Sequence, residues 1–372
     1  MHVGNTVAQY DAAVDMTGLN RIVDYRPPDL VVVAEAGMTI AALQAELGKN
    51  NQRLPFDVQS AYSATIGGSL ASNTIGPLSG RYGGVRDLVI GMSIVQADGT
   101  MTKSGGSVVK NVAGYDMARL HIGALGTLGA IATVAFKIGP VPEVKRTIAA
   151  WFDSVESAAI AGIQITNGAF MPEAVTLVAG QRATAKASEL AADGSDKVSD
   201  NAVMLLVALA AGPATVERQV NDTTATLGGA MADGFVALDD DLQLAAWSLA
   251  GPQSPAPALS IRSTLKPTAA LSLVGALAKS DNFDDTHIVA QIGFGTVEAH
   301  FRGDVSGEVI RSVQDAVIET GGACMIERCP SDLKQDLDVF GDLGAPLEVM
   351  RRMKQQFDPT GTLSPGRFAG RI

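Results

Sequence analysis

Cysteine, histidine and tryptophan are scarce in this chain, and acidic residues outnumber basic ones. Its 372 residues include two cysteines, four histidines and two tryptophans. A single Cys324-x4-Cys329 pair in a chain of this length excludes a disulfide scaffold. Two thiols are also too few for an iron–sulfur cluster, which usually takes about four ligands, so we interpret them as free thiols. The formal net charge of −11 disfavours a nucleic-acid partner, because phosphates would be repelled.

Long apolar runs and internal repeats are absent as well. The most apolar stretch, residues 203–211, is far shorter than the roughly 20 residues of a membrane helix. The first residues lack the basic region and apolar run of a secretory signal. We therefore expect a cytoplasmic protein without a transmembrane segment. The length favours two domains, and the 47% hydrophobic fraction is ample for two cores.

Glycine, by contrast, is abundant and concentrated in one stretch. Residues 63–84, S-A-T-I-G-G-S-L-A-S-N-T-I-G-P-L-S-G-R-Y-G-G, contain six glycines and a single charged residue. A segment of this composition presents bare backbone, against which a large flat ligand can lie. Successive N–H groups in turns also form concavities that suit phosphate oxygens. The stretch therefore predicts a binding site for a flat, phosphate-bearing ligand.

A series of motifs makes this prediction specific. In chain order they are Thr65-Ile66-Gly67-Gly68, Tyr82-Gly83, R-D-L-V-I-G at 86–91, V-K-N-V-A-G-Y-D at 109–116 and G-T-L-G at 126–129. The series resembles the FAD domain of the vanillyl-alcohol-oxidase-type (PCMH-type) flavoproteins. The K-N-V-A-G-Y-D run resembles, more narrowly, the smaller FAD-binding subunit of bacterial glycolate oxidase. The D-P-T-G and P-G-R motifs at 358–361 and 365–367 are similar to that family's closing motif.

The resemblance implies a fold and its domains. We expect the α+β class, as a two-domain PCMH-type FAD-binding fold with an α+β cap domain. Residues 1–142 would form the FAD-binding domain, 143–345 the cap, and 346–372 a C-terminal segment that returns to the FAD domain. Members usually begin with a glycine-rich pyrophosphate loop, which would be truncated here to Gly4-Asn5-Thr6. Alternating strands and helices in the cap predict a sheet with helices on one side.

The same resemblance supplies the expected cofactor contacts. They are Thr65, Ile66, Gly67, Gly68, Ser72, Asn73, Gly76, Tyr82, Gly83, Asp87, Gly114, Gly126, Thr127, Ile131 and Ser364. The backbone at 65–68, with the side chains of Ser72 and Asn73, would hold the pyrophosphate and part of the flavin ring. Gly126, Thr127 and Ile131 would face the adenine or the ring. A serine at position 364 replaces the asparagine that the family often has there.

The sequence assigns the catalytic side less well. The larger, catalytic relatives carry a cap motif like H-x-G-D-G-N-x-H, which binds metal or substrate. The matching segment here is Q-I-G-F-G-T-V-E-A-H at 291–300, in which Gln291 replaces the first histidine and the Asp-Gly-Asn core is missing. We therefore expect no metal site. His300 is a weak candidate for a base near the flavin, and we favour its interpretation as an ordinary strand residue.

Three functions stay open at this point. The first is the FAD-binding subunit of a complex that oxidises a small 2-hydroxy acid such as glycolate, beside a larger flavin subunit and an iron–sulfur subunit. Such a subunit would pass electrons or hold the assembly together, in the cytoplasm or at the inner face of the membrane through its partners. The second is a self-sufficient FAD-dependent dehydrogenase of a small hydroxy acid or alcohol. The third is a flavin-free scaffold.

Overall fold

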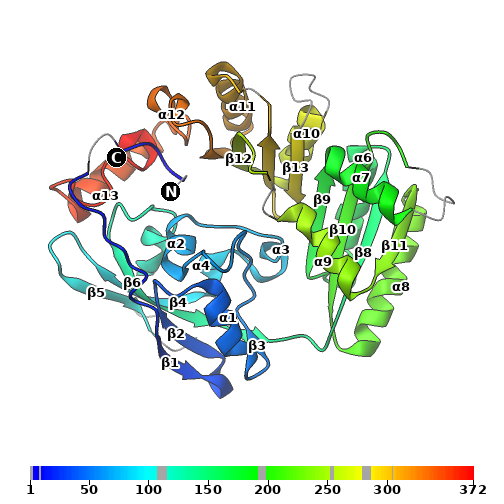
Figure 1. Cartoon of the computed structure of the whole chain (residues 1–372), viewed down its shortest axis with the longest axis horizontal. Helices are drawn as coiled ribbons and strands as arrows, with labels where there is room; N and C mark the ends of the chain where they lie inside the picture. The colour runs from blue at the N-terminus through cyan, green and yellow to red at the C-terminus, as the bar shows by residue number, and fades with distance from the viewer. Residues whose placement is uncertain are drawn as a thin grey trace. The chain divides into compact units, whose positions relative to one another are not determined.

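The computed structural model describes residues 3–7, 10–106, 115–191, 198–251, 255–278, 286–303 and 305–372. The chain divides into two compact units (Figure 1). We call residues 3–141 with 334–372 the first unit, and residues 142–333 the second unit. The returning segment thus begins at Lys334, earlier than the expected residue 346. The Lys334 ammonium donates a hydrogen bond to the Gly4 carbonyl (3.3 Å), within the same unit.

A five-stranded antiparallel sheet forms the base of the first unit, in the order β1-β2-β6-β4-β5. Its strands are β1 (Ile22–Arg26), β2 (Val31–Glu35), β4 (Val89–Val95), β5 (Met101–Gly105) and β6 (Ala130–Lys137). A separate pair joins β3 (Gln52–Arg53) to β7 (Gly139–Pro140). The β4–β5 turn contains Gly99, whose φ of +82° lies in the left-handed region that glycine tolerates.

The helices of the first unit are mostly short. They are α1 (Ile40–Gly48), α2 (Ile66–Ala71), α3 (Ser79–Tyr82), α4 (Val85–Leu88), α5 (Ala118–His121) and α13 (Pro346–Phe357), with 3-10 turns at Pro27–Asp29 and Ala369–Arg371. The short helix α12 (Leu333–Asp336) lies at the boundary of the two units. Thr39 caps α1, because its hydroxyl accepts the Ala42 N–H at 3.2 Å.

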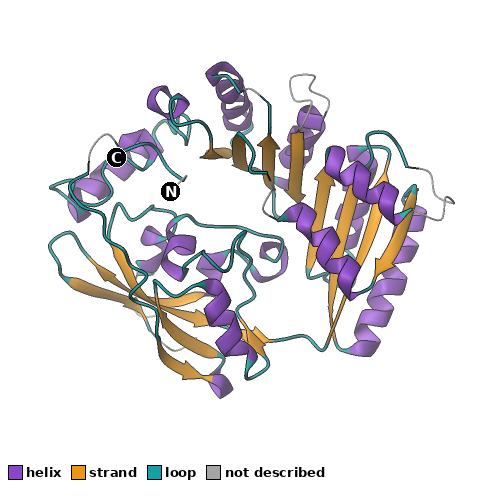
Figure 2. Ribbon diagram, in the orientation of Figure 1, coloured by secondary structure: helices purple, strands orange, loops and turns teal. Residues whose placement is uncertain are grey.

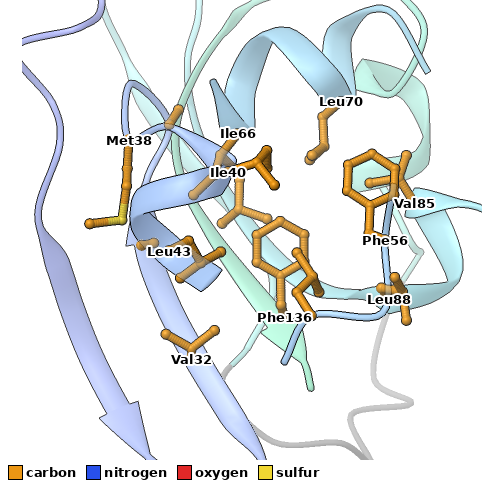
Figure 3. Packing of buried hydrophobic residues seen from close by; sticks show 14 of the residues in the cluster. Val32, Met38, Ile40, Leu43, Phe56, Ile66, Leu70, Val85, Leu88 and Phe136 are labelled. Atoms are coloured by element: carbon orange, nitrogen blue, oxygen red, sulfur yellow. The ribbon is translucent and has the colours of Figure 1, made fainter. Parts of the chain in front are cut away.

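One hydrophobic core fixes the glycine-rich α2 on this sheet (Figure 3). Ile66 and Leu70 of α2 are completely buried and belong to the same cluster as Phe136 of β6. Ile40 and Leu43 of α1 complete that side of the cluster. The apolar residues of the motif therefore serve packing, and they hold its glycines in a defined place.

The second unit is built on an eight-stranded antiparallel sheet, in the order β11-β8-β10-β9-β13-β14-β12-β15. Its strands are β8 (Val144–Phe152), β9 (Ala174–Ala179), β10 (Val203–Ala211), β11 (Gly234–Leu238), β12 (Leu259–Thr264), β13 (Thr286–Gln291), β14 (Thr296–Phe301) and β15 (Ala323–Arg328). Its helices are α6 (Val155–Thr166), α7 (Gln181–Leu190), α8 (Pro213–Gly229), α9 (Asp240–Trp247), α10 (Pro267–Ala278) and α11 (Gly307–Glu319), with the 3-10 turn η2 (Ser248–Ala250).

Helices lie on both faces of this sheet, so the expectation of one covered side is wrong (Figure 2). Ala183 of α7 and Ala246 of α9 share an apolar cluster with Met204 of β10. The next residue of that strand, Leu205, points to the opposite face. A side chain at Gly162 of α6 would lie 3.2 Å from Leu205, which places α6 on that face.

Both units combine antiparallel sheets with helices, which confirms the expected α+β class. In the described part of the chain, no helix has the length and apolar character needed to cross a membrane.

Candidate functional site

The Thr65-Ile66-Gly67-Gly68 motif forms the start of α2. Thr65 is the N-cap, and its hydroxyl accepts the Gly68 N–H at 3.1 Å. The two N–H groups between them, those of Ile66 and Gly67, donate to backbone carbonyls at 2.9 and 2.7 Å. All three N–H groups therefore have acceptors within the first unit. The structure argues against their predicted role as pyrophosphate donors.

Gly67 instead permits close packing of α2 on the chain after β2. A Cβ atom at Gly67 would lie 3.0 Å from the Ala36 Cβ and 3.2 Å from the Ala36 carbonyl oxygen. Any larger residue would push α2 away from the sheet. We still predict that the motif contacts the cofactor. The contact would be made by the Cα atoms of its glycines and by the Thr65 hydroxyl.

The C-terminal end of α2 meets the second glycine-rich segment. The N–H groups of Gly123 and Leu125 donate to the carbonyls of Leu70 (2.9 Å) and Ala71 (3.0 Å). These bonds supply partners for carbonyls at a helix end, which would otherwise lack them. The structure thus joins two motifs that lie about fifty residues apart in the sequence.

The loop after this junction has an unusual backbone. Leu125 and Gly126 both have positive φ, +52° and +74°. Thr127 is buried, with 1% of its surface exposed, and its hydroxyl donates to the Ala124 carbonyl at 2.7 Å. Positive-φ backbone presents carbonyls and N–H groups where side chains would otherwise stand. Gly126 therefore presents bare backbone in this loop, and the cofactor contacts of Gly126 and Thr127 stay predictions.

Other expected contacts hold their own loops together. Ser72 donates to the Gly68 carbonyl at 2.9 Å, and Asn73 has a φ of +48°. A Cβ atom at Gly76 would lie 2.5 Å from the Asp57 Cβ, so that position also requires glycine. The Asp57 carboxylate accepts the Leu78 N–H at 2.7 Å, which fixes the same loop.

Tyr82, Gly83 and Asp87 form a second supported turn. The Arg53 guanidinium donates to the Tyr82 hydroxyl at 2.9 Å and lies 5.3 Å from the centroid of its ring. The Asp87 carboxylate accepts the Gly84 N–H at 2.9 Å. It would also lie 2.6 Å from a Cβ atom at Gly83, whose φ is +82°. These contacts are structural, and a cofactor contact of the three residues stays a prediction.

The C-terminal tail returns to the Gly126 loop through a buried lysine. The Lys354 ammonium donates to the carbonyls of Thr127 (2.9 Å) and Leu363 (2.9 Å) and to the Asp358 carboxylate (2.6 Å). Lys354 is 9% exposed and Asp358 2% exposed. Asp358 also accepts the N–H groups of Leu363 (2.7 Å) and Thr362 (3.0 Å). One ion pair thus connects α13, the tail and the loop.

Sequence reasoning missed this pair, because a lysine on a helix usually lies at the surface. The available signal was its spacing, with Asp358 four residues after Lys354 at the end of an amphipathic helix.

The Asp358 carboxyl makes the stability of the first unit depend on pH. Burial raises its pKa, but the hydrogen bonds from Lys354, Leu363 and Thr362 lower it more, so the pKa lies below its ordinary value. A lowered folded-state pKa adds stability above pH about 4, which is lost as the pH falls through the folded-state value. We expect hydrogen exchange of α13 to accelerate below pH about 4, after correction for the intrinsic rate. An equally steep acceleration in Asp358→Asn would contradict this origin.

Ser364 lies beside Gly126. Its φ is +43°, and its hydroxyl would lie 3.5 Å from a Cβ atom at Gly126. The structure thus brings these two expected contacts together. Ile131 is 7% exposed and belongs to the hydrophobic core of the first unit, so its cofactor contact stays a prediction. Gly114 lies outside the described residues.

The N-terminal residues reach the same loop. Gly4 has a φ of +89°, and a Cβ atom there would lie 2.8 Å from both the Arg367 carbonyl and the Leu125 side chain. Asn5 is 1% exposed and donates to the carbonyl of Phe368 at 2.9 Å. The Asn5 amide oxygen accepts the Val339 N–H at 2.9 Å. The Gly4-Asn5 pair is therefore built into the tail rather than loosely attached.

These contacts test whether the first unit fits FAD. Gly126 and Ser364 lie side by side with positive φ, and Gly126 leaves its backbone bare. Such backbone suits a flat, phosphate-bearing molecule that approaches closely. The residues present fit the cofactor. Thr127, Gly126 and Ser364 would hold it, and the Lys354–Asp358 pair positions all three.

The cap segment at 291–300 forms a strand pair in the second unit. Gln291 accepts the Thr176 hydroxyl at 2.7 Å, in the place of the family's first histidine. His300 is a buried residue of β14, and its Nδ1 lies 3.0 Å from the Ser260 hydroxyl. Its Nε2 lies 3.7 Å from the Glu298 carboxylate. The structure thus places His300 in a strand, and its role as a base stays a prediction.

Arg262 lies on this part of the sheet in an ion pair. Arg262 of β12 contacts Glu327 of β15 at 2.8 Å. Burial raises the pKa of Glu327, and Arg262 partly offsets that rise. No group of three or more His, Cys, Asp or Glu among the described residues is arranged to hold a metal ion.

Two family profiles match the chain. The FAD binding domain matches residues 2–105, and the C-terminal domain of FAD linked oxidases matches residues 141–267 and 344–368. The first match lies mostly in the first unit. The match to the C-terminal domain includes the early strands of the second unit and the C-terminal tail, which belongs to the first unit. Together they account for most of the chain.

Curated relatives include two glycolate oxidase subunits. Glycolate oxidase subunit GlcD of Bacillus subtilis (strain 168) is 26% identical over 374 residues, 94% of this chain and 77% of that protein. Glycolate oxidase subunit GlcE of Escherichia coli (strain K12) is 37% identical over 128 residues, 34% of this chain and 37% of that protein. Mitochondrial D-2-hydroxyglutarate dehydrogenase of Rattus norvegicus is 32% identical over 142 residues, 38% of this chain and 26% of that protein.

Solved structures share the fold. Alkyldihydroxyacetonephosphate synthase superposes with a TM-score of 0.67 and 16% identity, over 95% of this chain and 68% of that one. At this identity the likeness concerns the fold alone, and it confirms the expected PCMH-type fold. Because the two profiles of this family together match most of the chain, the chain belongs to the FAD-linked oxidases, FAD-dependent oxidoreductases with a PCMH-type FAD-binding domain.

Proposed function

We propose that this chain is the FAD-binding subunit of a complex that oxidises a 2-hydroxy acid, with glycolate as the expected substrate. A larger flavin subunit would carry out the oxidation, and an iron–sulfur subunit would accept electrons. This chain would pass electrons between them or hold the assembly together. The relatives named as glycolate oxidase subunits support the substrate class.

The observation that carries the proposal is the chemistry of the 291–300 segment. Where the catalytic relatives have histidines and an Asp-Gly-Asn core, this chain has Gln291 bonded to Thr176 and an apolar Phe294. Oxidation of a hydroxy acid requires a group that accepts the hydroxyl proton. His300 is already bonded to Ser260 within the sheet. This arrangement favours an assisting subunit over a catalytic one.

FAD, when bound, supplies the site with a two-electron acceptor that can release electrons one at a time. The protein's own part is to position it. Lys354 fixes the Thr127 carbonyl and the tail before Ser364, while Gly126 leaves room for close approach. None of these groups transfers a proton, which agrees with a role in holding the cofactor rather than in attacking a substrate.

A second function is a self-sufficient FAD-dependent dehydrogenase of a hydroxy acid. The relative named as a D-2-hydroxyglutarate dehydrogenase supports it. Here the isolated chain would reduce its own flavin when a substrate is added. The two functions therefore differ in one measurable property.

We expect the isolated chain to bind FAD, with absorption bands near about 370 and 450 nm, and to keep those bands when glycolate is added anaerobically. Dithionite should bleach them, which serves as the control for a reducible flavin. Tagged chain should co-purify with a second flavoprotein and an iron–sulfur protein. Bleaching by glycolate alone would favour the second function. A chain that stays colourless with added FAD would favour a scaffold.

A further inference from the structure

Strand β11 lies at one end of the eight-stranded sheet of the second unit (Figure 1). It pairs with β8 in an unbroken antiparallel register, from Gly234 opposite Trp151 to Leu238 opposite Thr147. Among the described strands, β8 is the only one that pairs with it. In an edge strand, about half of the backbone N–H and C=O groups point away from the sheet. The outer side of β11 is therefore able to pair with a further strand.

The other edges of the two large sheets carry features that hinder such pairing. At the opposite end of the same sheet, β15 carries Glu327 and Arg328, and its register with β12 is irregular. In the first unit, β1 carries Asp24 and Arg26 and has an irregular register with β2, and β5 carries Lys103. Charges and bulges protect edge strands from other chains. The β11 sequence, G-F-V-A-L, has no charge and no proline, and its register has no shift.

Exposed apolar side chains lie near this edge. Phe235 of β11 is exposed, and so is Met231, which comes just before the strand. Leu242 and Leu244 are exposed residues of α9, the helix that follows β11 and contacts it. Large apolar side chains that lie close together on a surface mark sites of protein contact. An unprotected strand edge and apolar side chains thus occur at the same place.

We propose that β11 is a docking edge, to which a partner subunit adds an extended segment as a ninth strand of the sheet. The proposal rests on the proposed function, in which this chain belongs to a complex. Only an extended segment can pair with the outward N–H and C=O groups of a strand. These main-chain hydrogen bonds would supply affinity, and the exposed Phe235 and Ala237 would contact side chains of the added strand.

The charges at the two ends of β11 argue against a second copy of this chain as the occupant. Asp233 precedes the strand, and the exposed Asp239 and Asp241 follow it. An antiparallel register that pairs all five residues of β11 with those of a second β11 places Val236 opposite itself. Asp233 of each copy would then lie opposite Asp239 of the other, and like charges in that position destabilise a strand pair. An apolar segment with a lysine or arginine near each end instead gains pairs of opposite charge.

The first test measures the binding of a synthetic peptide to the full, FAD-loaded chain by fluorescence anisotropy at low ionic strength. The labelled probe is acetyl-K-T-V-I-V-T-K-amide, and its matched control is the same peptide with glutamate at both ends. The lysine probe should bind with a Kd below about 1 mM, and the glutamate peptide at least about tenfold more weakly. Equal affinities of the two peptides would overturn the proposal. No binding of the lysine probe up to about 1 mM would overturn it as well.

Methylation of the peptide backbone tests for strand pairing. A strand uses the N–H groups of alternate residues at each of its two edges. A lysine probe with N-methyl groups on alternate residues keeps one free edge, and should bind within about threefold of the parent probe. A probe with N-methyl groups on every residue has the same side chains but no free edge, and should bind at least about tenfold more weakly. An unchanged affinity of the fully methylated probe would contradict strand addition.

Matched variants of the chain locate the probe on β11. Ala237→Lys adds a positive charge to an exposed position of the edge, and should weaken binding of the lysine probe at least about tenfold. Ala237→Glu should bind it at least as tightly as the parent, which shows that a larger side chain there is tolerated. Ala323→Lys makes the lysine change at an exposed residue of β15, at the opposite end of the same sheet, and should behave like the parent. Equal affinities of the two lysine variants would overturn the proposal.

Co-purification relates the docking edge to the complex. Tagged Ala237→Lys should recover less of the second flavoprotein and the iron–sulfur protein than tagged Ala323→Lys, while both variants keep their flavin absorption. An intact complex with Ala237→Lys would overturn the docking edge and leave the proposed function standing. Absence of these partners from the parent chain as well would contradict the proposed function, and peptide binding then decides the docking edge by itself. A dimer of the isolated chain that dissociates in Ala237→Lys would show that a second copy occupies the edge, and would overturn the proposal.

Discussion

Asp358→Asn is expected to destabilise the C-terminal tail by about 3 to 5 kcal/mol and to abolish tight FAD binding. The change removes the carboxylate that pairs with the Lys354 ammonium at 2.6 Å, and leaves a buried charge without its counter-ion. Asp358 also orders the N–H groups of Thr362 and Leu363 just before Ser364. Native-state hydrogen exchange of α13 measures the stability, and FAD titration measures the affinity.

The same helix offers a matched control. Arg352 and Glu348 form an ion pair at 3.1 Å, but their side chains are 76% and 56% exposed. Arg352→Ala should cost no more than about 0.5 kcal/mol and leave FAD affinity unchanged, because solvent screens exposed pairs. Equal effects of Asp358→Asn and Arg352→Ala would show that the buried pair is not the link described here.

Gly126→Val is expected to weaken FAD binding at least about tenfold. Gly126 has a φ of +74° and lies beside Ser364, where bare backbone would meet the cofactor. A branched side chain would fill that space and also strain the loop. Fluorescence quenching of added FAD measures the affinity directly.

Gly99→Val separates the loss of space for the cofactor from the strain of the loop. Gly99 has a similar φ of +82°, but it lies in the β4–β5 turn, and a side chain there would meet no atom within 4 Å. Both variants should lose comparable stability, of at least about 1 kcal/mol, from the left-handed backbone. Only Gly126→Val should lose FAD. A loss of affinity in both would mean that the strain, and not the site, is responsible.

Local sequence features predicted much of the first unit. The Thr65-Ile66-Gly67-Gly68 motif contains its own N-cap, and the helix it begins places Ile66 and Leu70 in the core. Gly126 and Ser364 were recognised as parts of one site although they lie far apart in sequence, and the structure places them side by side. The motifs succeed because positive φ and apolar spacing are properties of a few consecutive residues.

Roles that depend on distant partners were not predictable. The glycine motif was expected to donate N–H groups to a phosphate, but the strand end at Ala36 takes one of them. Helices on both faces of the second sheet also escaped prediction, because β10 is apolar on both sides and periodicity cannot assign its faces.

The sequence by itself determined the family, the α+β class and the cofactor, because each depends on motifs read along the chain. Only the tertiary structure decided which charged groups are buried and which groups they form hydrogen bonds with. Lys354 reaches the Thr127 carbonyl across 227 residues of sequence. The energy of a buried charge depends on neighbours brought together by folding, and no local pattern records them.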